Sequence, residues 1–202
     1  MNRTNLAELQ ACEPGDPISP LIREMLVQLG EDPEREGLRR TPERVACAMR
    51  HLVEGYRQNP ASVLNRALFA AEDSGLVVVR NVEFFSLCEH HMLPFMGRIH
   101  VAYLPGTRVI GLSKIPRLID IFARRLQIQE RLTAQIADCI EFLIEPVGVC
   151  VVSEARHFCM MMRGVEKQHS DAAVNCWRGV FKKDENLRRE VLSMIERGRS
   201  PL

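Results

Sequence analysis

The pattern that decides the fold begins after Gly75, where the chain reads Leu76-Val77-Val78-Val79-Arg80-Asn81-Val82-Glu83-Phe84-Phe85. β-branched and aromatic residues at this density favour extended backbone. A second such run covers residues 98–104 and ends at a Pro-Gly turn, and two more cover residues 149–162 and 172–181. We therefore predict four strands, arranged as two pairs with helical sequence between them.

Apolar residues at helical spacing surround these strands. The sequence Thr41-Pro42-Glu43 is typical of a helix start, because it offers a capping hydroxyl, a proline for the first turn and an acid near the positive end of the helix dipole. A stripe that precedes it ends at Gly30, a residue suited to a helix C-terminus, and consists of Leu21, Ile22, Met25, Leu26 and Leu29. Two further stripes separate the strand pairs, at residues 115–122 and 132–143, and a last helix begins at about Asp184. This order predicts an α+β domain in which helices pack on one face of an antiparallel sheet.

Composition excludes several classes of protein. The 202 residues include 27 basic and 26 acidic side chains and are 46% hydrophobic, which indicates a globular chain rather than a disordered or fibrous one. A net charge of +1 gives no overall reason to expect nucleic acid or an anionic membrane as a partner. No apolar run approaches the roughly 20 residues of a membrane helix, and residues 1–17 lack the apolar core of a secretion signal. We expect a cytoplasmic protein.

Seven cysteines, an odd number, favour thiols and a possible metal site over a disulfide framework. The densest chemistry is Cys88-Glu89-His90-His91, followed much later by His157-Phe158-Cys159. A thiolate and an imidazole three residues apart can converge on one ion, and a third ligand from elsewhere leaves the fourth tetrahedral position for water. The alternative is that the cysteines are small buried hydrophobes. That interpretation applies to Cys12, Cys47, Cys139 and Cys150, which we predict not to bind metal.

Period-two spacing in the third strand would place His157, Cys159, Met161 and Arg163 on one face. In an extended chain Arg163 would lie roughly 13 Å beyond Cys159, which would suit the charged tail of a substrate that reacts at a metal. The alternative is a strand with one polar face in water.

The start of the helix near residue 114 carries cations where the dipole prefers anions. Ser113, Lys114 and Arg117, together with free backbone N–H groups, would form a phosphate site, although the default interpretation of either cation alone is a solvated surface residue. The next helix begins at Gln129-Glu130. A glutamate there stabilises a helix without any ligand, but its carboxylate could also accept two parallel hydrogen bonds from guanine.

Four segments in the right order resemble motifs of the GTP cyclohydrolase I family, and the similarity runs over residues 29–195. They are Ser86-Leu87-Cys88-Glu89-His90-His91, Val109-Ile110-Gly111-Leu112-Ser113-Lys114, the run of residues 124–133 around Gln129-Glu130-Arg131, and His157-Phe158-Cys159-Met160-Met161-Met162-Arg163-Gly164. The resemblance implies the tunnelling fold in residues 71–202 as the catalytic domain, after an irregular leader (1–17) and an N-terminal helical region (18–70). It also implies a homodecamer of two pentamers with active sites between subunits.

The resemblance also assigns roles to individual residues. It implies Zn²⁺ on Cys88, His91 and Cys159, and His90 and His157 as acid/base groups. Guanine recognition falls on Gln129 and Glu130, and triphosphate contacts fall on Ser113, Lys114, Arg117, Arg163 and Arg44. The implied reaction opens the imidazole ring of GTP, releases C8 as formate and closes a pterin ring to give 7,8-dihydroneopterin triphosphate. The residues suit it, because a metal lowers the pKa of water and histidines shuttle protons.

One segment departs from the family pattern. Ala172 and Val174 stand where the family usually carries hydroxyl residues. We expect this change to alter packing or assembly and to leave GTP chemistry intact, because a folded protein should also have lost or satisfied the former hydrogen-bond partners. Two alternatives stay open: a paralogue that opens another purine nucleotide or gives another product, and a catalytically silent nucleotide- or pterin-binding regulatory subunit.

Overall fold

The structure of the chain, a computed structural model, describes residues 15–64, 67–72 and 75–198. The chain divides into two compact units, Met1–Val53 and Glu54–Leu202, and each is described by itself. Most of the predicted leader lies outside the described residues. The predicted division into a leader, a helical region and a catalytic domain stays a prediction.

The first unit contains helices α1 (Ile18–Gln28) and α2 (Thr41–Leu52). The predicted stripe of α1 is only partly buried: Leu26 is covered, whereas Leu21, Met25 and Leu29 are exposed. The predicted cap of α2 is wrong, because Thr41 is the first helical residue and its hydroxyl donates to the carbonyl of Gly37. Pro42 does lie in the first turn, as its missing N–H allows.

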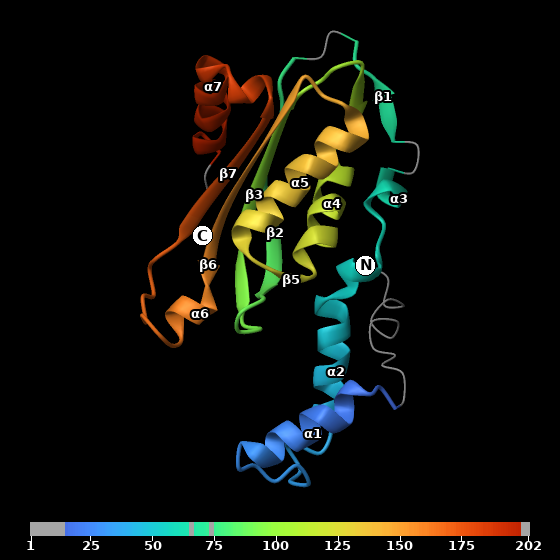
Figure 1. Cartoon of the computed structure of the whole chain (residues 1–202), viewed down its shortest axis with the longest axis vertical. Coiled ribbons are helices and arrows are strands. Elements are labelled where there is room, and N and C mark those ends of the chain that lie inside the picture. The colour runs from blue at the N-terminus through green and yellow to red at the C-terminus, as the bar shows by residue number, and fades with distance from the viewer. Residues whose placement is uncertain (1–14, 65–66, 73–74, 199–202) are drawn as a thin grey trace. The chain divides into compact units, whose positions relative to one another are not determined.

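A five-stranded sheet in the order β5-β2-β3-β6-β7 is the centre of the second unit (Figure 1). The four predicted strands are present as β2 (Val77–Cys88), β3 (Pro94–Leu104), β6 (Gly148–His157) and β7 (Ala172–Gly179), and neighbouring pairs are antiparallel. The short β5 (Leu126–Gln127) pairs parallel to the end of β2. A separate ribbon joins β1 (Leu68–Ala70) to β4 (Arg108–Ile110). These three strands were not predicted, because two or three residues are too few to show a period.

Helices α4 (Lys114–Ala123) and α5 (Gln129–Ile144) pack side by side on one face of this sheet, as predicted (Figure 1). Their apolar stripes meet the sheet in one core, whose largest fully buried members include Ile115, Leu118, Ile119, Leu132, Ile136, Ile140, Phe84, Phe95, Ile99 and Tyr103. The tunnelling-type α+β fold expected from the sequence is therefore present.

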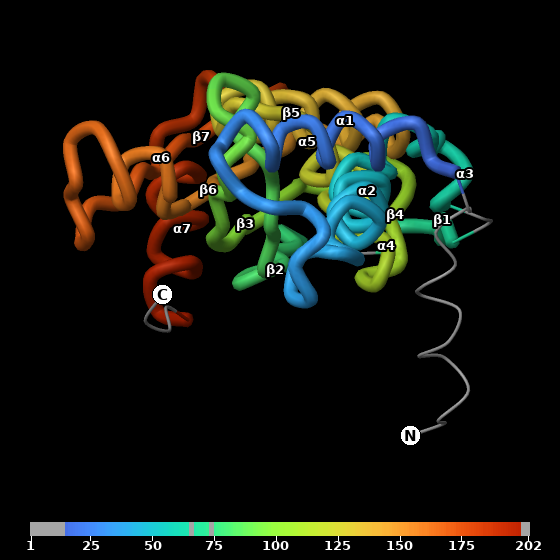
Figure 2. The backbone as a smooth tube through the Cα atoms, turned by 90° about the horizontal axis from the view of Figure 1, so that it is seen from below, coloured from blue at the N-terminus to red at the C-terminus, as the bar shows by residue number. Residues whose placement is uncertain are grey.

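A helix also covers part of the opposite face of the sheet, and the sequence analysis did not predict this. Helix α7 (Glu185–Glu196) begins after Asp184, whose carboxylate accepts from the N–H of Leu187. Val191 and Ile195 of α7 join Cys150 and Val152 of β6 in a second core. Figure 2 shows α7 on the other side of β6 and β7 from α5. Alternate residues of β6 therefore serve two different cores.

The strand predicted over residues 149–162 ends early. β6 stops at His157, and Phe158–Met161 forms the short helix α6. The shared face predicted for His157, Cys159, Met161 and Arg163 is therefore wrong. Three consecutive methionines follow Cys159, and methionine is a good helix former, which accounts for the change of backbone.

The departure at Ala172 and Val174 lies on the face of β7 that also carries the buried Cys176. The hydroxyls of Ser153 and Thr133, which lie near this face, both have hydrogen-bond partners. The Ser153 and Thr133 hydroxyls are 2.7 Å apart and hydrogen-bonded to each other, and the Gln129 amide also donates to Ser153 Oγ. Both hydroxyls therefore have partners without a hydroxyl on β7.

The 3-10 helix η3 (Glu54–Arg57) and the short helix α3 (Pro60–Leu64) lie against α4. Gly55 is buried and donates its N–H to the carbonyl of Arg124 at 3.0 Å. A Cβ at Gly55 would stand 2.1 Å from the carbonyl oxygen of Ile121, closer than any real contact. Only glycine allows η3 to approach α4 this closely.

We expect Gly55→Ala to lower the free energy of unfolding by about 1–3 kcal/mol, because the new methyl group forces η3 away from α4. Chemical denaturation monitored by circular dichroism measures this difference. Gly75→Ala is the matched control, since nothing lies within 4 Å of its Cβ position, and it should leave stability nearly unchanged. Equal stability of the two variants would contradict the packing argument.

Candidate functional site

Cys88 is the last residue of β2 and is buried. A tight turn follows it: the N–H of Met92 donates to the carbonyl of Cys88, and the N–H of Cys88 donates to the carbonyl of Leu93, both at 2.8 Å. Met92 adopts a left-handed backbone with φ of 53°. This turn brings the imidazole of His91 back to the strand end, with its Nδ1 3.9 Å from Cys88 Sγ.

Cys159 approaches the same place from α6. One ligand atom each from Cys88, His91 and Cys159 lies within 4.8 Å of the other two, so the three residues form a group that could hold a metal ion. Two thiolates and an imidazole are a typical zinc donor set, and tetrahedral bonds of about 2.3 Å to sulfur and 2.0–2.1 Å to nitrogen place neighbouring ligands roughly 3.6–3.8 Å apart. The observed Cys88–His91 distance of 3.9 Å is close to this value.

Electrostatics at this group favour a cation. Burial and the nearby Cys88 sulfur raise the pKa of the Cys159 thiol. Two adjacent thiolates repel each other, and a bound divalent ion would remove that repulsion. The three side chains therefore fit a metal, and its binding would release protons.

Arg163 and His90 lie beside the group. An Nη1 of Arg163 is 3.2 Å from Nε2 of His91, so Arg163 does not lie 13 Å beyond the cysteine, as an extended chain would have placed it. Because α6 is helical, the chain folds back on itself. His90 Nδ1 is 3.7 Å from Cys88 Sγ, and the His90 side chain is largely exposed.

His157 ends β6 and is half-buried, with its ring stacked on Phe95 at a centroid distance of 4.8 Å. Its Nε2 lies 2.9 Å from Oε1 of Gln129. The Gln129 amide nitrogen donates to Ser153 and to the carbonyl of Ala172, so its oxygen must face His157. Burial lowers the pKa of His157, which favours the neutral ring. Neutral His157 therefore donates from Nε2 and keeps Nδ1 free to accept a proton.

The family resemblance implies guanine recognition by Gln129 and Glu130. The Gln129 side chain is buried, and both of its polar atoms already have partners inside the protein. As the first residues of α5, however, both have backbone N–H groups without an acceptor inside the helix. The Glu130 carboxylate is exposed beside them. Base recognition by these residues stays a prediction, and Gln129 serves in this structure to orient His157.

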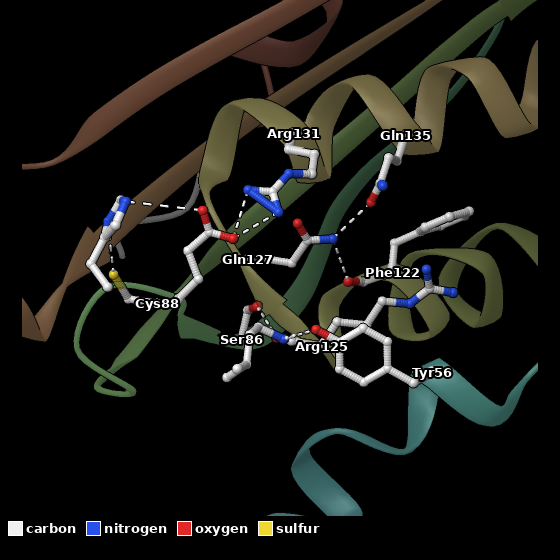
Figure 3. A network of polar contacts seen from close by, with 11 residues as sticks. Tyr56, Ser86, Cys88, Phe122, Arg125, Gln127, Arg131 and Gln135 are labelled. Carbon is white, nitrogen blue, oxygen red and sulfur yellow. Dashed lines mark hydrogen bonds and ion pairs between the residues drawn. The ribbon is translucent and has the colours of Figure 1, made fainter.

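A partly buried ion pair connects α5 to the loop that carries His91. The sequence analysis did not identify this pair. Both terminal nitrogens of Arg131 contact Glu89 Oε2, at 2.7 and 2.6 Å, and Figure 3 shows Arg131 reaching from α5 toward the loop after Cys88. The N–H of Glu89 also donates to the carbonyl of Gln127. Glu89 and Arg131 both lie inside the quoted motifs, but only the fold shows that they meet.

Lys114 and Arg117 line a cavity of about 570 Å³ whose lining includes no member of the Cys88, His91 and Cys159 group. The predicted free N–H groups at this helix start are wrong. The N–H of Lys114 donates to Gly111, the N–H of Ile115 donates to Leu112, and the next residue is a proline. Ser113 precedes the helix but makes no capping hydrogen bond through its side chain.

Arg44 belongs to the first unit. It is exposed on α2, where its guanidinium donates to the carbonyl of Gly37 and contacts the hydroxyl of Thr41. Its predicted contact with a phosphate stays a prediction.

The expectation of thiols holds for five cysteines, which are free: Cys88, Cys139, Cys150, Cys159 and Cys176. It is wrong for Cys47, which forms a disulfide. Cys12 lies outside the described residues. Burial raises the pKa of Cys139 to about 11, so this thiol stays protonated at neutral pH.

A five-stranded sheet with two long helices on one face and a Cys-His-Cys group at the strand ends defines a tunnelling-fold domain with a candidate metal centre. A profile of the GTP cyclohydrolase I family matches residues 18–196. The chain belongs to this family.

Individual relatives agree with the family assignment. GTP cyclohydrolase 1 of Deinococcus radiodurans is 53% identical over 89% of this chain and 83% of its own length. GTP cyclohydrolase 1 of Leptospira biflexa is 53% identical over 88% and 97%. Among solved structures, that of the archaeosine synthase QueF-Like in the apo form is similar over 54% of this chain and 97% of that chain, with 16% identity and a TM-score of 0.45. The assignment depends on the sequence matches alone.

None of the described helices has the length and apolar character needed to cross a membrane.

The metal group leads to a direct test. We expect Cys88→Ala and Cys159→Ala each to lose the bound metal, because two protein ligands no longer satisfy a tetrahedral site. Elemental analysis of the purified variants gives the metal-to-chain ratio. Cys139→Ala, which removes a thiol from the middle of α5, is the control and should keep full occupancy. Full occupancy in either ligand variant would remove the assignment.

Proposed function

We propose that the chain is a zinc-dependent GTP cyclohydrolase I, which converts GTP and water to formate and 7,8-dihydroneopterin triphosphate, a first step toward tetrahydrofolate or other pterins. The observation that carries the proposal is the convergence of Cys88, His91 and Cys159, the last of which follows His157 by two residues, in a chain that belongs to this family. When bound, zinc would lower the pKa of a water molecule and so supply a nucleophile for C8 of the base at neutral pH.

The two histidines suit proton transfer in different ways. His157 is neutral, is oriented by Gln129 and presents Nδ1 as a base. His90 is exposed beside Cys88 and can exchange protons with solvent or with substrate. We assign to this pair the proton movements at the ring nitrogen and the ribose oxygen that ring opening and reclosure require.

Substrate binding would combine several elements. Glu130 and the free N–H groups at the start of α5 are suited to the guanine edge, since a carboxylate accepts two parallel N–H bonds. Arg163 beside His91 is suited to a phosphate near the reacting ring. Ser113, Lys114, Arg117 and Arg44 are the remaining triphosphate candidates.

The metal group and the Lys114–Arg117 cavity belong to different places in the second unit. This separation supports active sites formed between subunits, in which one copy supplies the metal group and another supplies the cations. We propose a homo-oligomer, a decamer of two pentamers, in the cytoplasm.

The test of activity is incubation with GTP. We expect formate and, after oxidation, a fluorescent pterin, both in amounts equal to the GTP consumed. Cys88→Ala should give neither, since it lacks the metal. If the intact protein consumes GTP but releases no formate, the reaction proposed here is wrong, and analysis of the product then separates a ring-opening paralogue from it.

Sharing of the site between subunits has its own test. Cys88→Ala and Lys114→Ala should each be inactive as homo-oligomers, and their co-expression should restore about a quarter of the sites, as random pairing of two subunit types predicts. Formate release by the mixed oligomer is the measurement. Co-expression of Cys88→Ala with Cys159→Ala, which damage the same half of the site, should restore nothing.

The double variant Ala172→Thr with Val174→Thr restores hydroxyl residues on β7 and tests the effect of their absence. We expect both the unmodified chain and this variant to open GTP, because Ser153 and Thr133 already satisfy each other beneath β7. An inert unmodified chain that gains activity in the double variant would instead identify a diverged paralogue.

A further inference from the structure

Three cationic side chains line the cavity beside α4. The third of them, Arg57, belongs to none of the quoted motifs. Arg57, the last residue of η3, lines it opposite Lys114 and Arg117 of α4. The remaining lining residues are neutral: Gln58, Asn59, Ser62, Val63 and Ile121. With a volume of about 570 Å³, the cavity falls in the range of small-molecule sites and exceeds what one phosphate ion would fill.

Within the described part of the chain, the side chains of Arg57, Lys114 and Arg117 have no ion pair or hydrogen bond. Other arginines of this unit do form ion pairs: Arg124 pairs with Glu54, Arg131 with Glu89 and Arg178 with Asp138. Three unpaired positive charges around one cavity, with no acidic residue in its lining, create a local positive potential that attracts a multiply charged anion.

The first turn of α4 offers no free N–H group for this purpose. The N–H groups of Lys114 and Ile115 are already bonded to Gly111 and Leu112, and Pro116 has none. An anion that contacts the start of α4 must therefore be held there by side chains, so the number of cations around the cavity affects how long a phosphate chain it can bind.

The position of Arg57 is set by contacts on the residues immediately before it. Glu54 forms an ion pair with Arg124, and Gly55 donates its N–H to the carbonyl of Arg124. The hydroxyl of Tyr56 accepts from the N–H of Leu126 at 3.1 Å, and Figure 3 shows Tyr56 at this edge of the network. With three consecutive residues held, the backbone of Arg57 is in place before any ligand arrives, which lowers the entropic cost of binding.

We propose that Arg57 is a third polyphosphate-binding residue and that it makes this cavity selective for a triphosphate over a monophosphate. The proposal rests on the proposed function, in which Lys114 and Arg117 bind the triphosphate of GTP. Arg57 contacts a terminal part of the chain that a nucleoside monophosphate lacks. The alternative, a solvated surface arginine, predicts no effect on any phosphate ligand.

The test uses three variants of the full-length, metal-loaded protein. Arg57→Gln removes the charge and keeps a hydrogen-bonding side chain, and Arg57→Lys restores the charge. Arg189→Gln is the matched control, since Arg189 is exposed on α7 and pairs only with Glu185 of its own helix. Steady-state kinetics with GTP, inhibition by GMP, and calorimetric titration with inorganic tripolyphosphate are measured, with the metal content checked after titration because tripolyphosphate chelates metals.

We expect Arg57→Gln to raise the KM for GTP and the Kd for tripolyphosphate about tenfold, as loss of one charge-assisted contact implies, with kcat and GMP inhibition within twofold of the unmodified protein. Arg57→Lys should recover most of the binding, and Arg189→Gln should change nothing. The melting temperature of Arg57→Gln without ligand should be unchanged or higher, because a repelling charge is removed.

Tripolyphosphate binding within twofold in Arg57→Gln, or an equal loss of GTP and GMP affinity, would overturn the proposal. If the unmodified protein does not convert GTP but loses tripolyphosphate affinity in Arg57→Gln, the proposed function fails and the role of Arg57 stands. If GTP is converted and Arg57→Gln binds normally, the proposed function stands and the role of Arg57 is wrong.

Discussion

The side-chain amide of Gln129 is the contact on which the candidate site depends most. It lies under the sheet at the first turn of α5 and joins three elements: its nitrogen donates to Ser153 of β6 and to the carbonyl of Ala172 at the start of β7, and its oxygen accepts from His157. A buried amide is costly unless every polar atom has a partner, and here each one does. The same hydrogen bonds that join α5 to the strands therefore also set the tautomer of His157.

A second polar link acts from the outer side of α5. Arg131 contacts Glu89, the residue directly after Cys88, so the turn that carries the first two metal-ligand candidates is connected to the same helix that orients His157 (Figure 3). The Arg131–Glu89 pair is only partly buried, so it adds little to global stability. Its main effect is to fix the position of the loop after Cys88. Gln129 and Arg131, two residues of one helical turn, thus organise both halves of the proposed chemistry.

Much of the fold could be predicted from the sequence, because long β-branched runs and apolar stripes report directly on burial. The strands β2, β3, β6 and β7 and the stripes of α4 and α5 follow from that pattern. The helix at Cys159 did not, since its four residues carry too little periodicity to distinguish the end of a strand from a single helical turn. The pairing of Glu89 with Arg131 and the place of Arg57 depend on tertiary contacts between segments 42 and about 60 residues apart, which no local pattern reports.

Helix α6 has one property that bears on how the metal centre forms. None of its four residues is buried, and residues 162–169, which follow it, are all exposed. Cys159 packs against the first core but is only partly buried, whereas Cys88 is buried at the end of β2. A bound metal ion would then also fix the segment around α6 against the end of β2. Metal binding and the ordering of this segment would therefore be coupled. The metal-free chain would have low local stability here, and the affinity for the ion would include the free energy of folding this segment.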